Sequence, residues 1–433
     1  MPANARLQVA PAAFDPRSGG RELDRTSHYA VASFVMLCAT IAFYPMTEPA
    51  ELTSNALNAS RIAELGLLAL AAGAITVAIL HRRCPISLVS RAPLIAFAFV
   101  LWAMLSSIWS LNPILSFARG VTLMLLLYIT AGLTIYIRDI SDDSVRATGI
   151  IMTSALLGSI VVLLLANVLI WGTALNFSED TAWSGRPGRL FFAQSGPLDT
   201  GELLSLAIIM SAFSIQRQLA KIALIGGLFW LLYLTDARNL IVFVPLALAV
   251  GLFQRGSTQL RFILASAAAC AFVVLIIFAL NGDLVKILPN DLWTLNGRTP
   301  LWDKAAGYIA ANPFLGVGYY ASRYYLMDSH FFAGHAHNAY VDTAMSLGLI
   351  GLLLLVAFLV YCVRVCIADS SAFLTIIVVL CGLGSTFNPL ILVSNPHTFY
   401  LFAVLFIVAE RVSRRQSVPE TSPIVWRNPA EIR

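Results

Sequence analysis

The most constraining feature of the chain is a series of long, continuous apolar runs. Twelve runs approach the roughly 20 residues that an α-helix needs to cross the hydrocarbon core of a membrane. They centre on residues 30–46, 63–80, 93–110, 116–137, 148–171, 201–215, 221–235, 239–254, 262–280, 338–366, 371–394 and 397–412. The runs do not alternate with polar residues at strand spacing, which excludes an outer-membrane β-barrel. We therefore predict an all-α polytopic integral membrane protein with about 12 transmembrane helices.

The low charge of the chain supports this prediction. Asp, Glu, Lys and Arg make up only 12% of the residues, and 58% are hydrophobic. A soluble domain carries about 25% charged residues, so a soluble globular enzyme is excluded. Disorder is excluded as well, because the chain is rich in apolar residues and its net charge is only +5.

The distribution of Lys and Arg predicts the orientation. An even number of spans places both termini on one side, and that side holds 19 of the 28 Lys and Arg residues, against 9 on the other. The positive-inside rule therefore predicts cytoplasmic termini. The first 29 residues are mostly polar and basic, so we expect no cleavable signal peptide and insertion through the first span.

These boundaries divide the chain into five parts. We predict a cytoplasmic tail at 1–29, nine spans within 30–280, a large outer loop at 281–337, three spans within 338–412 and a cytoplasmic tail at 413–433. Inside the loop, Thr299 suits a helix N-cap and Pro300 the first helical position. Apolar residues then recur at helical spacing, namely Leu301, Trp302, Ala305, Ala306 and Ile309. They predict a short interfacial helix with its apolar face on the membrane.

Four arginines on the outer side suggest a receptor for a polyanion, since a guanidinium grips phosphate in two places. Arg298 stands at a helix N-terminus, where the free N–H groups already favour an anion. Arg238 lies in a very short connection between spans, close to Asp236, and Arg186 and Arg189 lie in an outer loop. The alternatives are a lipid-headgroup contact for Arg298, an ion pair with Asp236 or a headgroup contact for Arg238, and solvated loop charges for the other two.

His337 is the candidate for proton transfer. It precedes Asn338 at the entrance of the tenth span, on the same side as the arginines, and the field of the helix N-terminus is expected to lower its pKa. A neutral imidazole is able to accept a proton. His335 and His337 form an HxH pair, but no further ligand set completes a zinc site, so no metal is expected.

Two other patterns carry little function. Gly316, Gly318 and Ala321 match a dinucleotide-binding pattern, but no strand precedes them, and we interpret the match as chance or a turn. None of the six cysteines lies in an outer loop, so we expect no disulfides.

The motifs together resemble a known family. A loop Arg is followed by TDAR before a span, then NGRTPLWDKAAGYIAANPFLGVG, then HNAYVDTAMSLGLIG. This order resembles the O-antigen ligase (WaaL) family, within the O-antigen ligase and polymerase superfamily of membrane glycosyltransferases, and covers roughly residues 180–365. Where the family commonly has Ser, this chain has Ala237. After Arg189 it has Leu190, Phe191 and Phe192, where a Gly-containing turn is more usual.

The resemblance implies a GT-C-like fold and a function. The implied activity is metal-independent, inverting transfer of an O-antigen polysaccharide from undecaprenyl diphosphate to the lipid A-core, which completes lipopolysaccharide. The implied location is the inner membrane of a Gram-negative bacterium with a periplasmic site, and neither a cofactor nor a nucleic-acid partner is expected. Arg238, Arg298 and His337 match the family's catalytic positions. Arg186, Arg189, Gln194, His335 and Asn338 are the candidate substrate-binding residues.

Three other functions stay open. An O-antigen or exopolysaccharide polymerase shares the donor but uses a second lipid-linked glycan as acceptor. A protein O-oligosaccharyltransferase usually carries a sizeable soluble C-terminal domain. A secondary transporter or flippase would bind a translocated anion at its arginines, but the polar residues gather in outer loops rather than at the membrane midplane.

Overall fold

The computed structural model describes residues 16–44, 59–141, 143–178, 188–193, 196–259, 261, 298–327, 335–369, 372–386 and 390–417. Within these ranges the structure is built from helices, apart from one small antiparallel hairpin of β1 (Asn176–Phe177) and β2 (Leu190–Phe191). The predicted class, an all-α membrane protein, is confirmed for this part of the chain.

Eleven of the twelve predicted spans coincide with helices, and the ninth, at 262–280, lies outside the described residues. Five helices, α2, α4, α5, α7 and α14, are long and apolar enough to cross a membrane by themselves. The number of spans stays a prediction. The helices that follow the predicted spans are α1 (Pro16–Ile41), α2 (Ala59–Arg82), α3 (Ala92–Leu105) with η1 (Ser106–Ile108), α4 (Pro113–Ile140), α5 (Ser144–Trp171), α6 (Pro197–Ser214), α7 (Gln218–Thr235), α8 (Arg238–Arg255), α14 (Ala339–Asp369), α15 (Ala372–Gly384) and α16 (Pro396–Ser417).

Helix α16 lies at the centre of the bundle. Every residue from Pro396 to Glu410 is buried, and the helix contacts α3, α4, α5, α6, α14 and α15. Phe402 packs edge-on against Phe358 of α14 and stacks on Phe406. A helix that is apolar on all sides in this way belongs in the interior of a large bundle.

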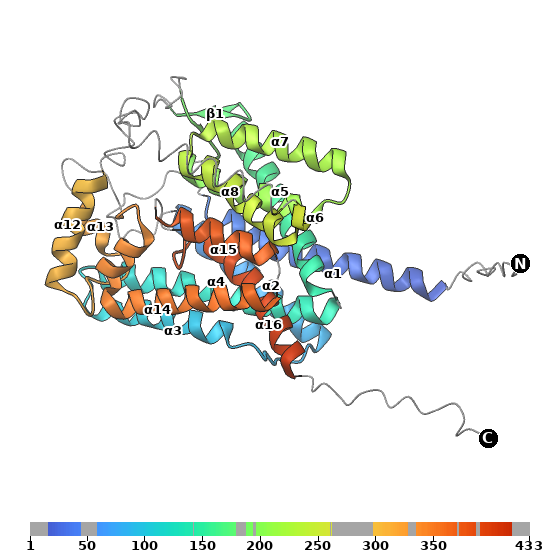
Figure 1. Ribbon diagram of the computed structural model, residues 1–433, viewed down its shortest axis with the longest axis horizontal. Coiled ribbons are helices and arrows are strands. Elements are labelled where there is room, and N and C mark those ends of the chain that lie inside the picture. The colour runs from blue at the N-terminus through green and yellow to red at the C-terminus, as the bar shows by residue number, and fades with distance from the viewer. Residues whose placement is uncertain are drawn as a thin grey trace, which may run out of the picture.

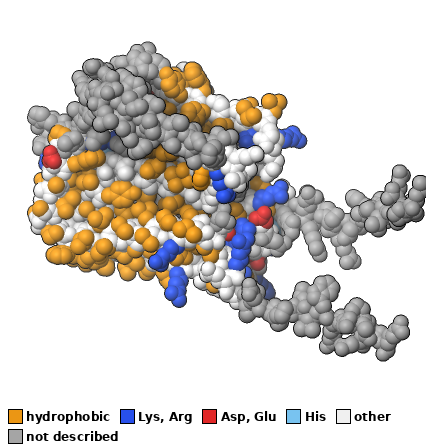
Figure 2. Space-filling view, in the orientation of Figure 1, with side chains coloured by type: hydrophobic (Ala, Val, Ile, Leu, Met, Phe, Trp, Pro, Cys, Tyr) orange, Lys and Arg blue, Asp and Glu red, His pale blue; other side chains and the backbone are white. Residues whose placement is uncertain are grey.

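Exposed apolar side chains cover the outside of the bundle. Helices α3 and α14 lie side by side (Figure 1). They expose large hydrophobic residues that include Leu94, Leu101, Leu353, Val356 and Val360. Figure 2 shows this broad hydrophobic surface, with Lys and Arg gathered at one end of the molecule. A continuous apolar surface of this extent is typical of a surface that faces lipid rather than water.

The two ends of the bundle differ in their polar contacts. At the end where α1 begins and α16 ends (Figure 1), ion pairs join the helices, such as Arg82 with Asp139 and Arg138 with Glu410. The opposite end carries the turn between α7 and α8 and the segment with α12 (Arg298–Ala311) and α13 (Ser322–Leu326). The second end holds the predicted functional residues.

Helix α14 is broken at Gly348, which has a left-handed φ of 65°. The loop at 313–318 fills the break: Val317 N–H donates to the Met345 carbonyl (2.9 Å), and Leu349 N–H donates to the Pro313 carbonyl (2.8 Å). Backbone groups in an apolar environment need partners within the protein, and this loop supplies them. The helix that follows the predicted span over 338–366 therefore contains a break at Gly348.

The loop that fills the break is the segment that matches the dinucleotide-binding pattern. Gly316 and Gly318 have φ values of 67° and 106°, in the region that favours glycine. A Cβ on Gly316 would lie 2.5 Å from the Ser346 carbonyl carbon. The interpretation of these glycines as a turn is confirmed.

We expect Gly348→Ala to destabilise the protein. The new Cβ would lie 2.2 Å from the Phe314 carbonyl oxygen, and the backbone conformation is one that Gly alone adopts readily. Thermal unfolding of the purified protein should show a loss of about 1–3 kcal/mol. Gly226→Ala is the control, because a Cβ there meets nothing within 4 Å. Equal unfolding temperatures for the two variants would contradict this account.

Candidate functional site

The predicted loop helix exists as α12 (Arg298–Ala311), and Arg298 is its first residue rather than the residue before the helix. Part of its apolar face is buried against protein. Leu301 and Ala305 are 2% and 0% exposed and pack in a cluster with Val317, Leu326 and Met345. This corrects the predicted interfacial position, because the same hydrophobic spacing suits burial against protein or lipid.

Helix α12 places Arg298 beside the predicted histidines. Trp302 Nε1 donates to the Ala336 carbonyl (2.9 Å), which joins the helix to the segment at 335–338. Arg298 lies one turn before Trp302 and therefore on the same face of α12. Its charge acts on both His335 and His337. The structure thus brings together three of the predicted residues.

The two imidazoles are in direct contact. Their ring centroids are 4.2 Å apart. The backbone N–H of His337 donates a hydrogen bond to Nδ1 of the His335 ring (3.1 Å). His337 has a left-handed φ of 49°, which is uncommon for a residue with a side chain. His337 Nδ1 is buried and has no hydrogen-bond partner among the described residues. Burying a polar nitrogen without a hydrogen-bond partner costs free energy of folding. Beside a cation, such a nitrogen indicates a place where a ligand could bind.

Burial and neighbouring cations keep both histidines neutral. Burial is the largest of three causes that lower the pKa of His337 to about 3, and the charges of His335 and Arg298 are the other two. Burial, followed by Arg323 and Arg298, lowers the pKa of His335 to about 4. The predicted direction for His337 agrees with this, but the cause differs, since burial and positive neighbours replace the field of the helix N-terminus.

Asn338 and Asp342 hold the histidine segment in place. Asn338 Oδ1 accepts hydrogen bonds from the backbone N–H groups of Tyr340 and Val341, and its Nδ2 donates to the Thr386 carbonyl. Asn338 therefore caps the start of α14. Asp342 Oδ1 accepts the Ala336 N–H (3.2 Å). The sequence prediction did not include Asp342. Its position four residues after Asn338 places both residues on the same face of a helix.

Arg323 is a second residue that sequence reasoning left out of the site. Its side chain is almost fully buried, and its guanidinium carbon lies 3.7 Å from the ring centroid of Tyr320. The charge of Arg323 is the largest cationic influence on the pKa of His335. In the sequence, Arg323 was recognisable only as a basic residue of the same outer loop.

Arg189 and Arg238 form a separate cluster around Asp236. Arg189 Nε and Arg238 Nε lie 4.0 and 3.9 Å from Asp236 Oδ2, and Arg189 Nε donates to the Thr235 carbonyl (3.2 Å). The predicted ion pair of Arg238 is therefore present. Arg189 contacts this cluster, and its side chain is 25% exposed. Counting only the residues of this cluster, two cations meet one carboxylate, an excess of one positive charge.

The turn before Arg238 packs closely against α6. Ala237 is fully buried, and a Cβ built on Gly201 of α6 would lie 2.7 Å from the Ala237 Cβ. The turn that carries Arg238 therefore packs directly on the α6 backbone at Gly201. A small residue suits position 237.

Two predicted binding residues, Arg186 and Gln194, lie outside the described residues. Within the part of the chain that the structure describes, no group of three His, Cys, Asp or Glu residues has the arrangement of a metal site.

The fold and this site define a helical membrane protein with histidine and arginine residues at one end of the bundle. In a comparison with known proteins, the family model described as O-antigen ligase matches residues 222–356 of this chain. That range contains Arg238, Arg298, His335 and His337. The resemblance inferred from the motifs is confirmed.

A curated relative is the exopolysaccharide production protein ExoQ of Rhizobium meliloti (strain 1021). It is 27% identical over 278 residues, which cover 61% of this chain and 63% of the relative. The match thus spans less than two thirds of the relative's length.

Proposed function

We propose that this protein is a glycosyltransferase that moves an O-antigen polysaccharide from undecaprenyl diphosphate to the lipid A-core, on the periplasmic face of the inner membrane. The observation that carries the proposal is the buried, unpartnered Nδ1 of His337 beside the cation Arg298. The match to the O-antigen ligase family model supports the reaction class.

The proposed reaction is a single displacement. The bond between the anomeric carbon and the diphosphate oxygen breaks, and a bond forms between that carbon and an acceptor hydroxyl oxygen. The hydroxyl proton passes to His337. Negative charge develops on the leaving undecaprenyl diphosphate, where Arg298 and Arg238 stabilise it. One displacement inverts the anomeric configuration.

The carboxylates near the site support inversion over retention. Retention requires a carboxylate nucleophile that is open to the substrate. Asp236 lies between Arg189 and Arg238, and Asp342 accepts a backbone hydrogen bond. Both carboxylates thus organise other groups.

The Arg189–Asp236–Arg238 cluster is proposed to hold the diphosphate. Figure 1 shows the turn between α7 and α8 at the end of the bundle where α12 also lies. Asp236 keeps both guanidiniums oriented, and the excess positive charge suits a dianionic group. In this proposal Arg186 and Gln194 extend the donor site, and His335 orients His337.

A second candidate is an exopolysaccharide polymerase, which the printed name of the relative favours. It would use the same donor and the same residues, with a second lipid-linked glycan as acceptor. A cell-free assay with purified protein and lipid-linked glycan separates the candidates. Product that requires lipid A-core supports the ligase, and elongation of donor alone supports the polymerase. Product on an acceptor protein, or transport without transfer, would contradict both.

The pH dependence of transfer tests the state of His337. Since its pKa is lowered to about 3, His337 stays neutral as the pH falls from neutral. The value of kcat/KM should therefore show no loss from this group between about pH 8 and about pH 5, where an unshifted histidine would lose activity below its pKa of about 6.5. Arg298→Gln removes a cation that lowers this pKa, so the acid limb should move upward. A wild-type acid limb near the unshifted value would contradict this account.

A further inference from the structure

A polar cavity lies at the other end of the bundle, between the end of α4, the start of α5 and the end of α16. Its volume is about 500 Å³, and four arginines line it: Arg138, Arg411, Arg414 and Arg415. Glu410 and Asp143 line it as well. None of these residues belongs to the candidate site.

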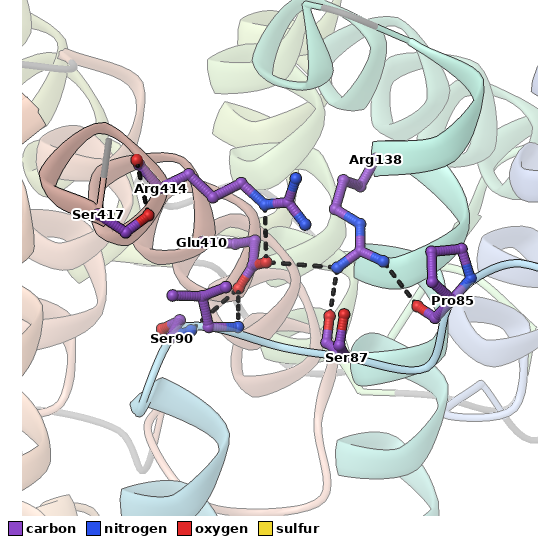
Figure 3. A network of polar contacts seen from close by, with 8 residues as sticks. Pro85, Ser87, Ser90, Arg138, Glu410, Arg414 and Ser417 are labelled. Carbon is purple, nitrogen blue, oxygen red and sulfur yellow. Dashed lines mark hydrogen bonds and ion pairs between the residues drawn. The ribbon is translucent and has the colours of Figure 1, made fainter. Parts of the chain in front are cut away.

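One wall of this cavity is held by a dense network around Glu410 (Figure 3). The Glu410 carboxylate accepts hydrogen bonds from the backbone N–H groups of Val89 (2.8 Å) and Ser90 (3.0 Å) and pairs with Arg138 (3.3 Å). Arg138 also donates to the carbonyls of Pro85 and Ser87. The network joins the end of α4 to α16 and leaves little freedom for Arg138.

The other three arginines reach outward from α16. Arg414 Nε pairs with Glu410 (3.0 Å), and Arg411 and Arg415 both pair with Asp369 (3.8 and 3.4 Å). The side chain of Arg411 is 37% exposed, that of Arg414 is 48% exposed and that of Arg415 is 57% exposed. Glu410 and Asp369 are thus both in ion pairs with arginines of α16. The same three arginines line the cavity.

Among the described residues at this cavity, the cations outnumber the anions. Asp143 Oδ1 accepts the Arg146 N–H and caps α5, so it serves the helix N-terminus. Counting Asp369 with the two lining acids, four cations meet three anions. The positive end of the α5 dipole adds to the excess. The cavity therefore favours an anion such as phosphate.

A second cavity of about 260 Å³ shares Asp143 and Arg411 with the first. Its lining includes apolar side chains from three helices, among them Val145, Phe213 and Phe373. The rings of Phe213 and Phe373 pack edge to face. A cationic space with apolar side chains beside it suits an amphiphile better than a free ion.

We propose that these two neighbouring cavities bind an anionic phospholipid, with its phosphate headgroup among the arginines of α16 and the start of an acyl chain beside Phe213 and Phe373. The lipid belongs to the leaflet opposite the candidate site. The site is therefore distinct from any donor site, and it does not depend on the proposed glycan transfer.

The test is native mass spectrometry of the purified full-length protein in neutral detergent, with phosphatidylglycerol, phosphatidylcholine or inorganic phosphate added. The variant is Arg414→Gln with Arg415→Gln, which leaves Glu410 paired with Arg138 and Asp369 paired with Arg411. The matched control is Arg217→Gln with Arg364→Gln, two exposed arginines that do not line either cavity.

The wild type and the control should retain phosphatidylglycerol over phosphatidylcholine. The Arg414/Arg415 variant should lose about 25-fold in that retention, since each of the two cations near a membrane surface contributes about fivefold. Equal retention by the variant would overturn the proposal. Displacement of the lipid by inorganic phosphate alone would overturn it too, because it would identify a free-phosphate site. Size-exclusion profiles confirm that both variants are folded.

Discussion

Replacing His337 with asparagine is expected to abolish glycan transfer while protein level and membrane insertion stay normal. A proton acceptor of this kind contributes about 10²- to 10⁴-fold to a rate. Asn tolerates the left-handed conformation that His337 adopts, so the backbone is kept and only the imidazole is lost. The measurement is the lipopolysaccharide ladder on a gel, together with the transfer rate of the purified protein.

His337→Ala should give the same result, which separates loss of the imidazole from any effect of the amide. His81→Ala is the control, because His81 is exposed at the opposite end of the bundle, in the last turn of α2. Persistence of the ladder in either His337 variant would refute the proposed role of this residue.

Replacing Arg298 with glutamine is expected to lower the transfer rate by about 10²- to 10³-fold, the usual loss when a group that stabilises developing charge is removed. Arg298→Lys keeps the charge but loses the planar fork of donors, so it should retain more activity than glutamine and less than the wild type. The loss should appear in kcat, since charge develops on the diphosphate only as the bond breaks.

Lys304→Gln is the matched control for Arg298. Lys304 lies on the same helix but six residues further along, which places it on another face. Full activity of Arg298→Gln, or an equal loss in Lys304→Gln, would contradict the assignment of Arg298 to the leaving group.

The helices were predictable because a long, continuous apolar run crosses a membrane as an α-helix. The break in α14 at Gly348 was not predictable, because the apolar run continues through it without a proline. The partner that satisfies the break is the loop at 313–318, about thirty residues earlier in the chain. Hydrophobicity alone therefore located α14 but not its internal geometry.

Helix α12 shows a second limit. Its spacing of Leu301, Trp302 and Ala305 predicted a helix, and the helix is present. The surface against which it packs was predicted wrongly, because an apolar stripe does not distinguish protein from lipid. That surface matters for function, since the contact of Trp302 with Ala336 places Arg298 beside the histidines.

The site residues were found as separate motifs, and their grouping required the structure. Arg298, His335 and His337 come together through the packing of α12. Arg189 and Arg238 come together through Asp236, although the two arginines lie far apart in sequence. The low pKa of His337 was predictable in direction but not in cause, because burial cannot be read from a single sequence position.

The most direct test of the account is the anomeric configuration of the linkage that the purified protein forms from a lipid-linked glycan of known configuration. Nuclear magnetic resonance of the product with lipid A-core as acceptor reports this configuration. A single displacement, with His337 as proton acceptor and Arg298 at the leaving diphosphate, predicts inversion. Retention of configuration would contradict the account, because it requires a covalent intermediate on a nucleophile that this site is not proposed to contain.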